Sequence, residues 1–422
     1  MLRGRFGRIA LLTTVAVAAT ALAWGAPEKK PAPVNGAAGV SAKTLAIHMK
    51  FLTLDTHLDT PAQIDTQGFD IMKRHDVAVD GSEVDVSRMN QGGLDGGFFA
   101  IYMAQGALTP EAYAKVRDTA LLRALAIHKM VAANPATFEL ALTPADARRI
   151  NAKGKKFVFV SMENSWELGD DLTLLDTFYK LGVRLAGPVH NGNNQLADSN
   201  SDPKGSKWNG LSPMGKAWVK RCNELGIVID GSHSSNQVID QMIDLSATPI
   251  ILSHHGASAL FAHPRNSPDD LLKKLAAKGG VIQMNTLFLK AAPSSPERDA
   301  AQAELVKKYG DPETLGAEKA SAFRTEMREL NKKYPQPRAD FEDYMKAILY
   351  TVKLVGPEHV GFGADWDGGG GLTGYEDVSY MPKVTERLLK AGYTEADLAN
   401  MWGGNVLRVM QQAQDYAAGL KH

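Results

Sequence analysis

The stretch FLTLDTHLD, residues 51–59, has a pattern that recurs along the chain: a short apolar run is followed at once by ionisable side chains. Further apolar runs, separated by segments of helical period, lie at residues 97–102, 157–160, 183–186, 227–229, 249–252, 281–284 and 360–363. Near-continuous apolar runs are typical of parallel strands that are buried on both faces. Eight such strands alternating with helices predict an α/β fold, a (β/α)8 TIM barrel.

One segment departs from this alternation. Residues 286–358 separate the seventh predicted strand from the eighth, and within them residues 296–333 are dense in Glu, Lys, Arg and Ala. This composition predicts an exposed helical hairpin inserted between strands seven and eight. We favour a solvated surface insertion over a functional lid. The glycines at residues 368–371 predict a flexible loop on the rim of the barrel.

The N-terminal 23 residues differ from the rest of the chain. Three arginines precede an apolar run that ends in Ala21-Leu22-Ala23, and these are the features of a secretory signal peptide. The run is shorter than the roughly 20 residues that span a bilayer, so we favour cleavage over a membrane anchor. Residues 24–42 predict a flexible lead-in, and residues 43–422 a single barrel domain. The expected location is periplasmic or secreted.

Composition excludes several classes of protein. Lys plus Arg and Asp plus Glu each number 47, so the formal net charge of zero gives no support to a nucleic-acid binder. No apolar stretch after the predicted signal is long enough to insert stably in a membrane. The single cysteine, Cys222, excludes an intrachain disulfide and a Cys-rich zinc site. Any metal must therefore be held by His, Asp or Glu.

The ends of the predicted strands carry many ionisable side chains, at Asp55, His57, Asp59, Glu163, His190, Asp230, His233, His254, His255, Asp365 and Asp367. In TIM barrels, catalytic side chains come from the carboxyl ends of the strands. Imidazole plus carboxylate without thiolate suits Zn²⁺ or another divalent transition ion. The rim supplies enough ligands for two ions, which in such sites lie about 3.5–4 Å apart.

Taken together, these blocks resemble the membrane (renal) dipeptidase family, peptidase family M19 of the amidohydrolase superfamily. The matching blocks include DTHLD (55–59), Glu163, HN (190–191), DGSH (230–233), SH (253–254), RNSPDD (265–270) and GADWDG (363–368). They follow the family's order from about residue 50 to about residue 410. The His-x-Asp of the first strand is the most specific block, because most relatives in the superfamily carry His-x-His there.

The resemblance implies two Zn²⁺ ions per chain, although other divalent transition ions would suit the same ligands. One ion would be held by His57, Asp59 and Glu163, and the other by Glu163, His233 and His254, with Glu163 bridging. His255 replaces the small residue that is usual after the sixth-strand ligand. Which of the two adjacent histidines binds metal therefore stays open at this stage.

The implied reaction is hydrolysis of dipeptides with a free C-terminal carboxylate, through a metal-bridging hydroxide. The resemblance gives His190 a catalytic and substrate-facing role, Arg265 the pairing with the substrate carboxylate, and Asp365 the proton transfer. The expected partners are small dipeptides, and a homodimer is plausible.

Two alternatives remain from the residues. One is another binuclear amidohydrolase reaction, such as hydrolysis of a β-lactam, a lactone or an N-acyl amino acid. The other is an exported binding protein without turnover, which the complete set of ligands and the strand-eight acid disfavour.

Overall fold

The computed structural model describes residues 39–64, 69–291, 295–310, 317–335 and 338–420. The predicted signal peptide, residues 1–23, and most of the predicted lead-in fall outside these residues. Ala42, the last residue of that lead-in, instead opens helix α1 (Ala42–His48), because the Ser41 side chain caps its first turn. Within the described part of the chain, no helix combines the length and the hydropathy that crossing a membrane requires.

Eight parallel strands match the eight apolar runs of the sequence. They are β1 (Leu54–Leu58), β2 (Gly96–Tyr102), β4 (Lys156–Glu163), β5 (Val183–Ala186), β6 (Val228–Ile229), β7 (Ile251–Ala257), β9 (Val281–Met284) and β10 (Val360–Phe362). Two short strands are added to them: β3 (Phe138–Leu140) pairs with β4, and β8 (Asn266–Ser267) pairs with the end of β7. β1 and β7 extend further towards the carboxyl side than the runs at 51–54 and 249–252 predicted. Several ionisable residues therefore lie within these strands rather than after them.

The strands close into a barrel. One sheet has the order β1-β2-β4-β5-β6 and the other β10-β9-β7-β8. Parallel bridges between Leu58 and Trp366 and between Asp230 and Ile251 join the two sheets at both seams. The backbone nitrogen of Asp59 also donates to Trp366 O at 2.9 Å across the first seam. The predicted (β/α)8 TIM barrel is confirmed.

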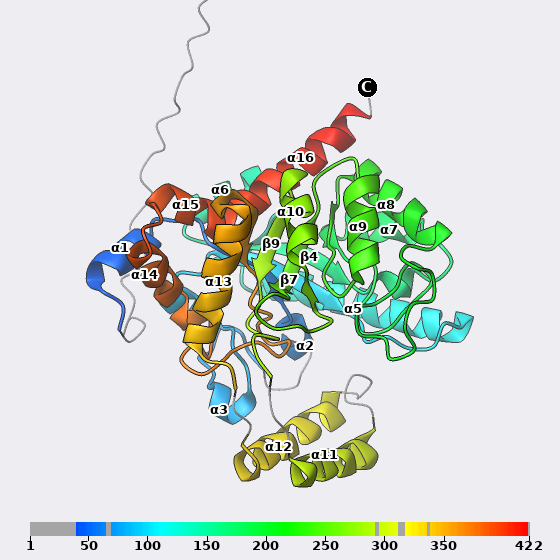
Figure 1. Ribbon diagram of the computed structural model, residues 1–422, viewed down its shortest axis with the longest axis horizontal. Coiled ribbons are helices and arrows are strands. Elements are labelled where there is room, and N and C mark those ends of the chain that lie inside the picture. Colours follow the sequence, from blue (N-terminus) through cyan, green and yellow to red (C-terminus); the bar gives the residue numbers. More distant parts are fainter. Residues whose placement is uncertain (1–38, 65–68, 292–294, 311–316, 336–337, 421–422) are drawn as a thin grey trace, which may run out of the picture.

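Helices surround the barrel (Figure 1). They include α5 (Pro110–Ala133), α6 (Pro144–Ala152), α7 (Leu174–Lys180), α8 (Pro213–Leu225), α9 (Asn236–Leu245), α10 (Asp269–Ala277), α13 (Phe341–Val355), α14 (Pro382–Lys390), α15 (Glu395–Ala399) and α16 (Asn405–Gly419). Short helices α2 (Pro61–Ile64), α3 (Val77–Asp80) and α4 (Val86–Gly92) follow β1. α5, α6 and α8 each begin with a Ser or Thr cap followed by Pro, a favourable start because the missing N–H of Pro has no partner there.

One end of the barrel is apolar. Interior side chains near the strand starts, among them Leu54, Phe98, Phe157 and Ile251, form one buried cluster with residues of α16. Figure 1 shows α16 crossing this end, whereas α2 and α3 lie towards the opposite one. Since α2 directly follows β1, that opposite end holds the carboxyl ends of the strands, where the ionisable residues lie.

The hairpin predicted between strands seven and eight is present as α11 (Pro296–Tyr309) and α12 (Ala317–Lys333). The Tyr309 hydroxyl donates to Glu326 at 2.6 Å, and Arg298 Nη2 donates to Asn331 at 2.9 Å, so polar contacts link the two helices. Figure 1 shows the hairpin set apart from the barrel, on the side of α2 and α3.

Candidate active site

Seven of the predicted site residues meet at the carboxyl ends of six strands. Three groups of side chains have ligand atoms within 4.8 Å of one another: His57, Glu163 and His254; Glu163, His190 and His233; and His57, Asp59 and Asp365. All seven side chains are buried. Because Glu163 and His57 each belong to two groups, the ligand atoms form one continuous cluster, which we call the His–carboxylate cluster.

Glu163 lies at the centre of this cluster. Its Oε2 lies 3.4 Å from His57 Nε2, whereas its Oε1 lies 3.0 Å from His233 Nε2 and 3.5 Å from His254 Nε2. Strand β4 explains the direction of the side chain: Phe157 and Phe159 belong to the interior cluster, and alternation along the strand puts Glu163 on the same side. The two oxygens of one carboxylate thus face different histidines, although His57 and His254 also lie close to each other, with ring centroids 3.9 Å apart.

Strands β1 and β7 each contain one extra residue in the stretch that carries His57 or His254. Between Leu252 and His255 the β7 register advances by three residues, while its partner β9 advances by two, from Ile282 to Met284. Strict alternation from the interior residue Ile251 would turn His255 inward; the extra residue brings His254 into the cluster instead. A matching irregularity lies in β1, between Asp55 and Leu58.

His255 lies outside the cluster. Its Nε2 contacts Ser267 Oγ on β8 at 2.9 Å, and none of the three ligand groups includes it. The geometry therefore favours His254 of the two adjacent histidines as a ligand.

The backbone is strained at the cluster. His233 and Asp365 adopt positive φ angles of 64° and 66°, and Asn164, directly after Glu163, has a φ of 65°. Such conformations cost roughly 1–3 kcal/mol each in non-glycine residues and tend to occur at functional sites. The fold therefore accepts local strain where it positions these side chains.

The electrostatics of the cluster suit bound cations. Burial raises the pKa of Glu163 to about 7 and that of Asp365 to about 6. Burial also lowers the pKa of His233 and His254 well below the usual value, so both imidazoles are neutral at pH 7. Neutral imidazole is the form that binds metals, and a cation would favour the ionised carboxylates.

His57 differs from the other histidines. Burial by itself lowers its pKa, but the carboxylates of Glu163 and Asp59 outweigh that effect and raise the pKa well above the usual value. His57 thus interacts strongly with its carboxylate neighbours. A cation bound between these groups would balance the negative charge of the carboxylates instead.

Two further observations fit a metal at the Asp59 end of the cluster. Asp59 Oδ1 is buried and has no hydrogen-bond partner, an expensive state for a carboxylate oxygen. A Cβ on Gly368 would lie 2.1 Å from Asp59 Oδ2 and 2.3 Å from Asp365 Oδ1, so only glycine leaves these oxygens accessible. The residues present therefore fit the divalent ions that their chemistry predicts.

Of the two predicted substrate-binding residues, His190 belongs to the cluster and Arg265 borders it. Arg265 Nη2 lies 3.0 Å from His233 Nε2, and Nη1 is buried without a hydrogen-bond partner. The pairing of β8 with the end of β7 brings Arg265 here, and it requires Gly256, where a Cβ would lie 2.3 Å from Asn266 Oδ1. Burial lowers the pKa of Arg265 to about 10, which leaves the guanidinium charged at pH 7.

His190 lies on the other side of His233, with ring centroids 4.1 Å apart. Burial and the neighbouring Arg265 lower its pKa to about 3, so its imidazole is neutral and has one N–H to donate. Tyr102, at the end of β2, packs edge-on against it at 4.8 Å.

Sequence reasoning gave no role to several residues of this region. Asp55 and Asp230 lie at the ends of predicted strands, and in the structure both are hydrogen-bond acceptors for backbone N–H groups. Ser253 belongs to the block SH (253–254), which gives it no role of its own, and no motif includes Tyr102. The position of Tyr102 at the end of a strand was the one available signal for it.

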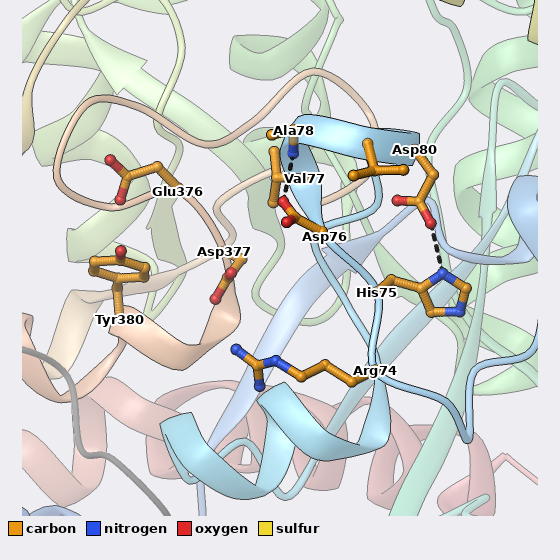
Figure 2. Close-up of a pocket in the computed structure, with 10 residues that line it drawn as sticks. Arg74, His75, Asp76, Val77, Ala78, Asp80, Glu376, Asp377 and Tyr380 are labelled. Carbon is orange, nitrogen blue, oxygen red and sulfur yellow. Dashed lines mark hydrogen bonds and ion pairs between the residues drawn. The ribbon is translucent and has the colours of Figure 1, made fainter.

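A cavity of about 850 Å³ lies elsewhere, and Figure 2 shows its lining. Arg74, His75, the α3 residues, Asp377 and Tyr380 surround it, and no member of the His–carboxylate cluster lines it. Its charged groups are engaged with each other and with neighbouring residues; for instance, His75 Nδ1 contacts Asp80 Oδ2 at 2.6 Å. The cluster, rather than this cavity, is therefore the candidate site for the chemistry of the protein.

A TIM barrel with buried imidazoles and carboxylates at its carboxyl rim defines a metal-dependent hydrolase. Comparison with known proteins narrows this class: residues 41–422 match the membrane dipeptidase family, peptidase family M19. The chain belongs to this family and is a peptide-bond hydrolase, as the sequence motifs predicted.

Individual relatives agree with this assignment. The chain is 30% identical to the dipeptidase aclJ of Aspergillus oryzae over 344 residues, 80% of this chain and 72% of the relative. The structure of the probable dipeptidase PvdM from Pseudomonas aeruginosa superposes with a TM-score of 0.75 at 30% identity, covering 89% of this chain and 98% of that one. A metallopeptidase from Rhodobacter sphaeroides, solved with a phosphinate mimic of L-Ala-D-Ala, shares the fold with a TM-score of 0.67 at 22% identity, covering 86% and 99%.

Proposed function

We propose that this protein is a zinc-dependent dipeptidase that hydrolyses the peptide bond of dipeptides with a free C-terminal carboxylate. The central observation is Glu163, whose two carboxylate oxygens face His57 on one side and His233 with His254 on the other. A carboxylate in this position suits a pair of divalent ions that share one ligand.

In this proposal, His57 and Asp59 would hold one ion and His233 and His254 the other, and Glu163 would be a ligand of both. Zn²⁺ fits a donor set of imidazole and carboxylate without thiolate. When bound, such ions polarise a carbonyl group and lower the pKa of water so that hydroxide forms near neutral pH. The buried side chains exclude bulk water and so strengthen electrostatic interactions in the cluster.

Three further residues act on the substrate. Arg265 pairs with the terminal carboxylate through its guanidinium, a planar group that can donate two parallel hydrogen bonds. His190 donates to the oxygen of the scissile carbonyl as negative charge develops there. Asp365 accepts a proton from the attacking water and delivers it to the nitrogen of the leaving amine.

The position of Arg265 supports a short substrate. Its Nη2 lies 3.0 Å from His233 Nε2, so a carboxylate held by the guanidinium lies next to the reacting centre. In a dipeptide, a single C-terminal residue would separate the carboxylate held by Arg265 from the scissile bond. The relatives that carry the name dipeptidase agree with this size.

A substrate screen combined with metal analysis tests the proposal. We expect about two zinc ions per chain by elemental analysis, and turnover of some members of a panel of L,L, L,D and D,D dipeptides. Turnover of β-lactams, lactones or N-acyl amino acids without any dipeptide turnover would instead support a different amidohydrolase reaction. A metal-free protein that hydrolyses dipeptides would contradict the zinc assignment.

We further propose that the protein is exported, by cleavage after Ala23, and acts in the periplasm or outside the cell. The basic and apolar regions of residues 1–23 support this location. N-terminal sequencing of the mature protein tests it: a chain that begins at Met1 in the cytoplasm would contradict export.

A homodimer is the assembly that we propose, and light scattering of the purified protein would measure it.

A further inference from the structure

Asp230, Ser253 and His254 form a chain of hydrogen bonds behind the His–carboxylate cluster. Ser253 Oγ donates to Asp230 Oδ2 at 2.5 Å and lies 2.9 Å from His254 Nδ1. Asp230 Oδ1 accepts from the backbone nitrogens of Ser232 at 2.9 Å and Ser253 at 2.8 Å. Each of the three side chains in the chain is at most 5% exposed, so water does not compete for these contacts.

The positions of the protons follow from what each group can donate. Ser253 Oγ is the donor in its contact with Asp230 Oδ2, so the single hydroxyl proton of Ser253 points towards Asp230. Ser253 Oγ then has only lone pairs left for His254, and the Nδ1 of His254 must carry the proton. The second ring nitrogen, Nε2, is the one that faces Glu163 at 3.5 Å and His233 at 2.8 Å.

We infer that Asp230 and Ser253 fix the tautomer and the ring orientation of His254, so that its Nε2 lone pair is directed at the metal. This inference deepens the proposed function and rests on it. Ser253 and Asp230 are positioning residues, since neither contacts the substrate or the reacting atoms. Partners of this kind raise the basicity of a ligating imidazole and hold it in place before the metal binds.

The neighbouring histidine offers a matched comparison. Ser267 Oγ donates to Asn236 Oδ1 at 3.0 Å and contacts His255 Nε2 at 2.9 Å, which is the same arrangement at a histidine outside the cluster. Both serines are completely buried. Loss of either hydroxyl therefore removes one buried Ser–His contact, but only the loss at Ser253 acts on a ligand of the cluster.

The experiment measures the affinity for Zn²⁺ of Ser253→Ala and Ser267→Ala by competition with a chelating dye. We expect Ser253→Ala to raise the Kd of the weaker site by roughly 10–100-fold, the range for lost partners of metal-ligating histidines. Ser267→Ala should keep the Kd of the unmodified protein. Equal Kd values for Ser253→Ala and the unmodified protein, or an equal loss in both variants, would overturn the inference.

A second measurement needs no variant. In metal-free protein labelled with ¹⁵N-histidine, the NMR signals of His254 should show a protonated Nδ1 and an unprotonated Nε2. The opposite tautomer would overturn the inference, even if Ser253→Ala fails to fold. Failure of the proposed function is distinguishable from failure of the inference, because the unmodified protein would then bind no Zn²⁺ or hydrolyse no dipeptide. Absence of Zn²⁺ binding would overturn the inference as well.

Discussion

Asp55 Oδ2 accepts a hydrogen bond from the backbone nitrogen of Ala364 at 3.0 Å. One carboxylate thus links the first barrel strand, β1, to the segment that follows the last barrel strand, β10. Its Oδ1 accepts from the backbone nitrogen of His57 at 2.9 Å. Both contacts are buried. The seam of the barrel and the first histidine of the His–carboxylate cluster thus depend on the same side chain.

Replacing Asp55 should therefore destabilise the barrel. Asp55→Ala leaves two buried N–H groups without a partner, and each such loss costs about 1–3 kcal/mol. Denaturant unfolding at constant zinc concentration would measure the change. Asp415→Ala, which removes an exposed carboxylate, should stay within about 0.5 kcal/mol of the unmodified protein. A similar small effect for Asp55→Ala would show that the seam does not depend on it.

Gly368→Ala tests whether the space beside Asp59 and Asp365 is needed. The added methyl group would lie 2.1 Å from Asp59 Oδ2, so we expect loss of bound metal and of activity in a folded protein. Gly187→Ala is the matched control, because a Cβ there meets Asp230 atoms at ordinary contact distances of 3.6–3.7 Å. Circular dichroism establishes folding and elemental analysis the metal content. Normal metal content and activity in Gly368→Ala would contradict the predicted geometry.

Asp365→Asn separates metal binding from proton transfer. The amide keeps the size of the side chain but cannot accept the proton, and general acid–base catalysis typically contributes roughly 10²–10⁴-fold to the rate. We therefore expect both metals to remain bound while kcat for a dipeptide falls by about that factor. Steady-state kinetics and elemental analysis on the same preparation measure both quantities. Full activity would exclude Asp365 as the proton acceptor.

Arg265→Met should weaken recognition of the substrate carboxylate. We expect kcat/KM for free dipeptides to fall by roughly 10–100-fold, as the loss of a buried charge-assisted hydrogen bond worth about 1.5–3 kcal/mol predicts. For C-terminally amidated dipeptides, which lack the carboxylate, kcat/KM should fall much less. Arg265→Lys keeps the charge without the planar guanidinium, so its kcat/KM for free dipeptides should lie between those of the unmodified protein and Arg265→Met. An equal loss on free and amidated substrates would show that Arg265 does not bind the carboxylate.

Removing the metals should lower thermal stability as well as activity. A ligand that binds only the folded state at 100 times its Kd stabilises that state by about 2.7 kcal/mol, so a chelator should lower the Tm and added zinc should restore it. His233→Ala, which lacks one of the proposed ligands, should respond less to both treatments. Differential scanning calorimetry makes the comparison. A Tm unaffected by chelator in the unmodified protein would argue against metals in the cluster.

Much of this architecture follows from short-range features of the sequence. Apolar runs separated by helical segments predicted all eight barrel strands, because strands buried on both faces must be apolar and each needs a covering helix. The charged, Ala-rich composition of residues 296–333 predicted the helical hairpin between strands seven and eight. The sequence also predicted the cluster, because ionisable side chains follow the apolar runs and the carboxyl ends of parallel strands meet at one rim.

The resemblance implied His254 as the ligand, but the geometric reason that favours His254 over His255 is not visible in the sequence. Alternation along β7 points to His255, and only the extra residue in the pairing of β7 with β9 turns His254 inward. The contact of Ser253 with Asp230, from a strand 23 residues away, likewise exists only in the closed barrel. The sequence by itself determined which side chains reach the rim. Their directions were decided by the tertiary structure, because side-chain orientation depends on register with a neighbouring strand and on contacts between distant segments.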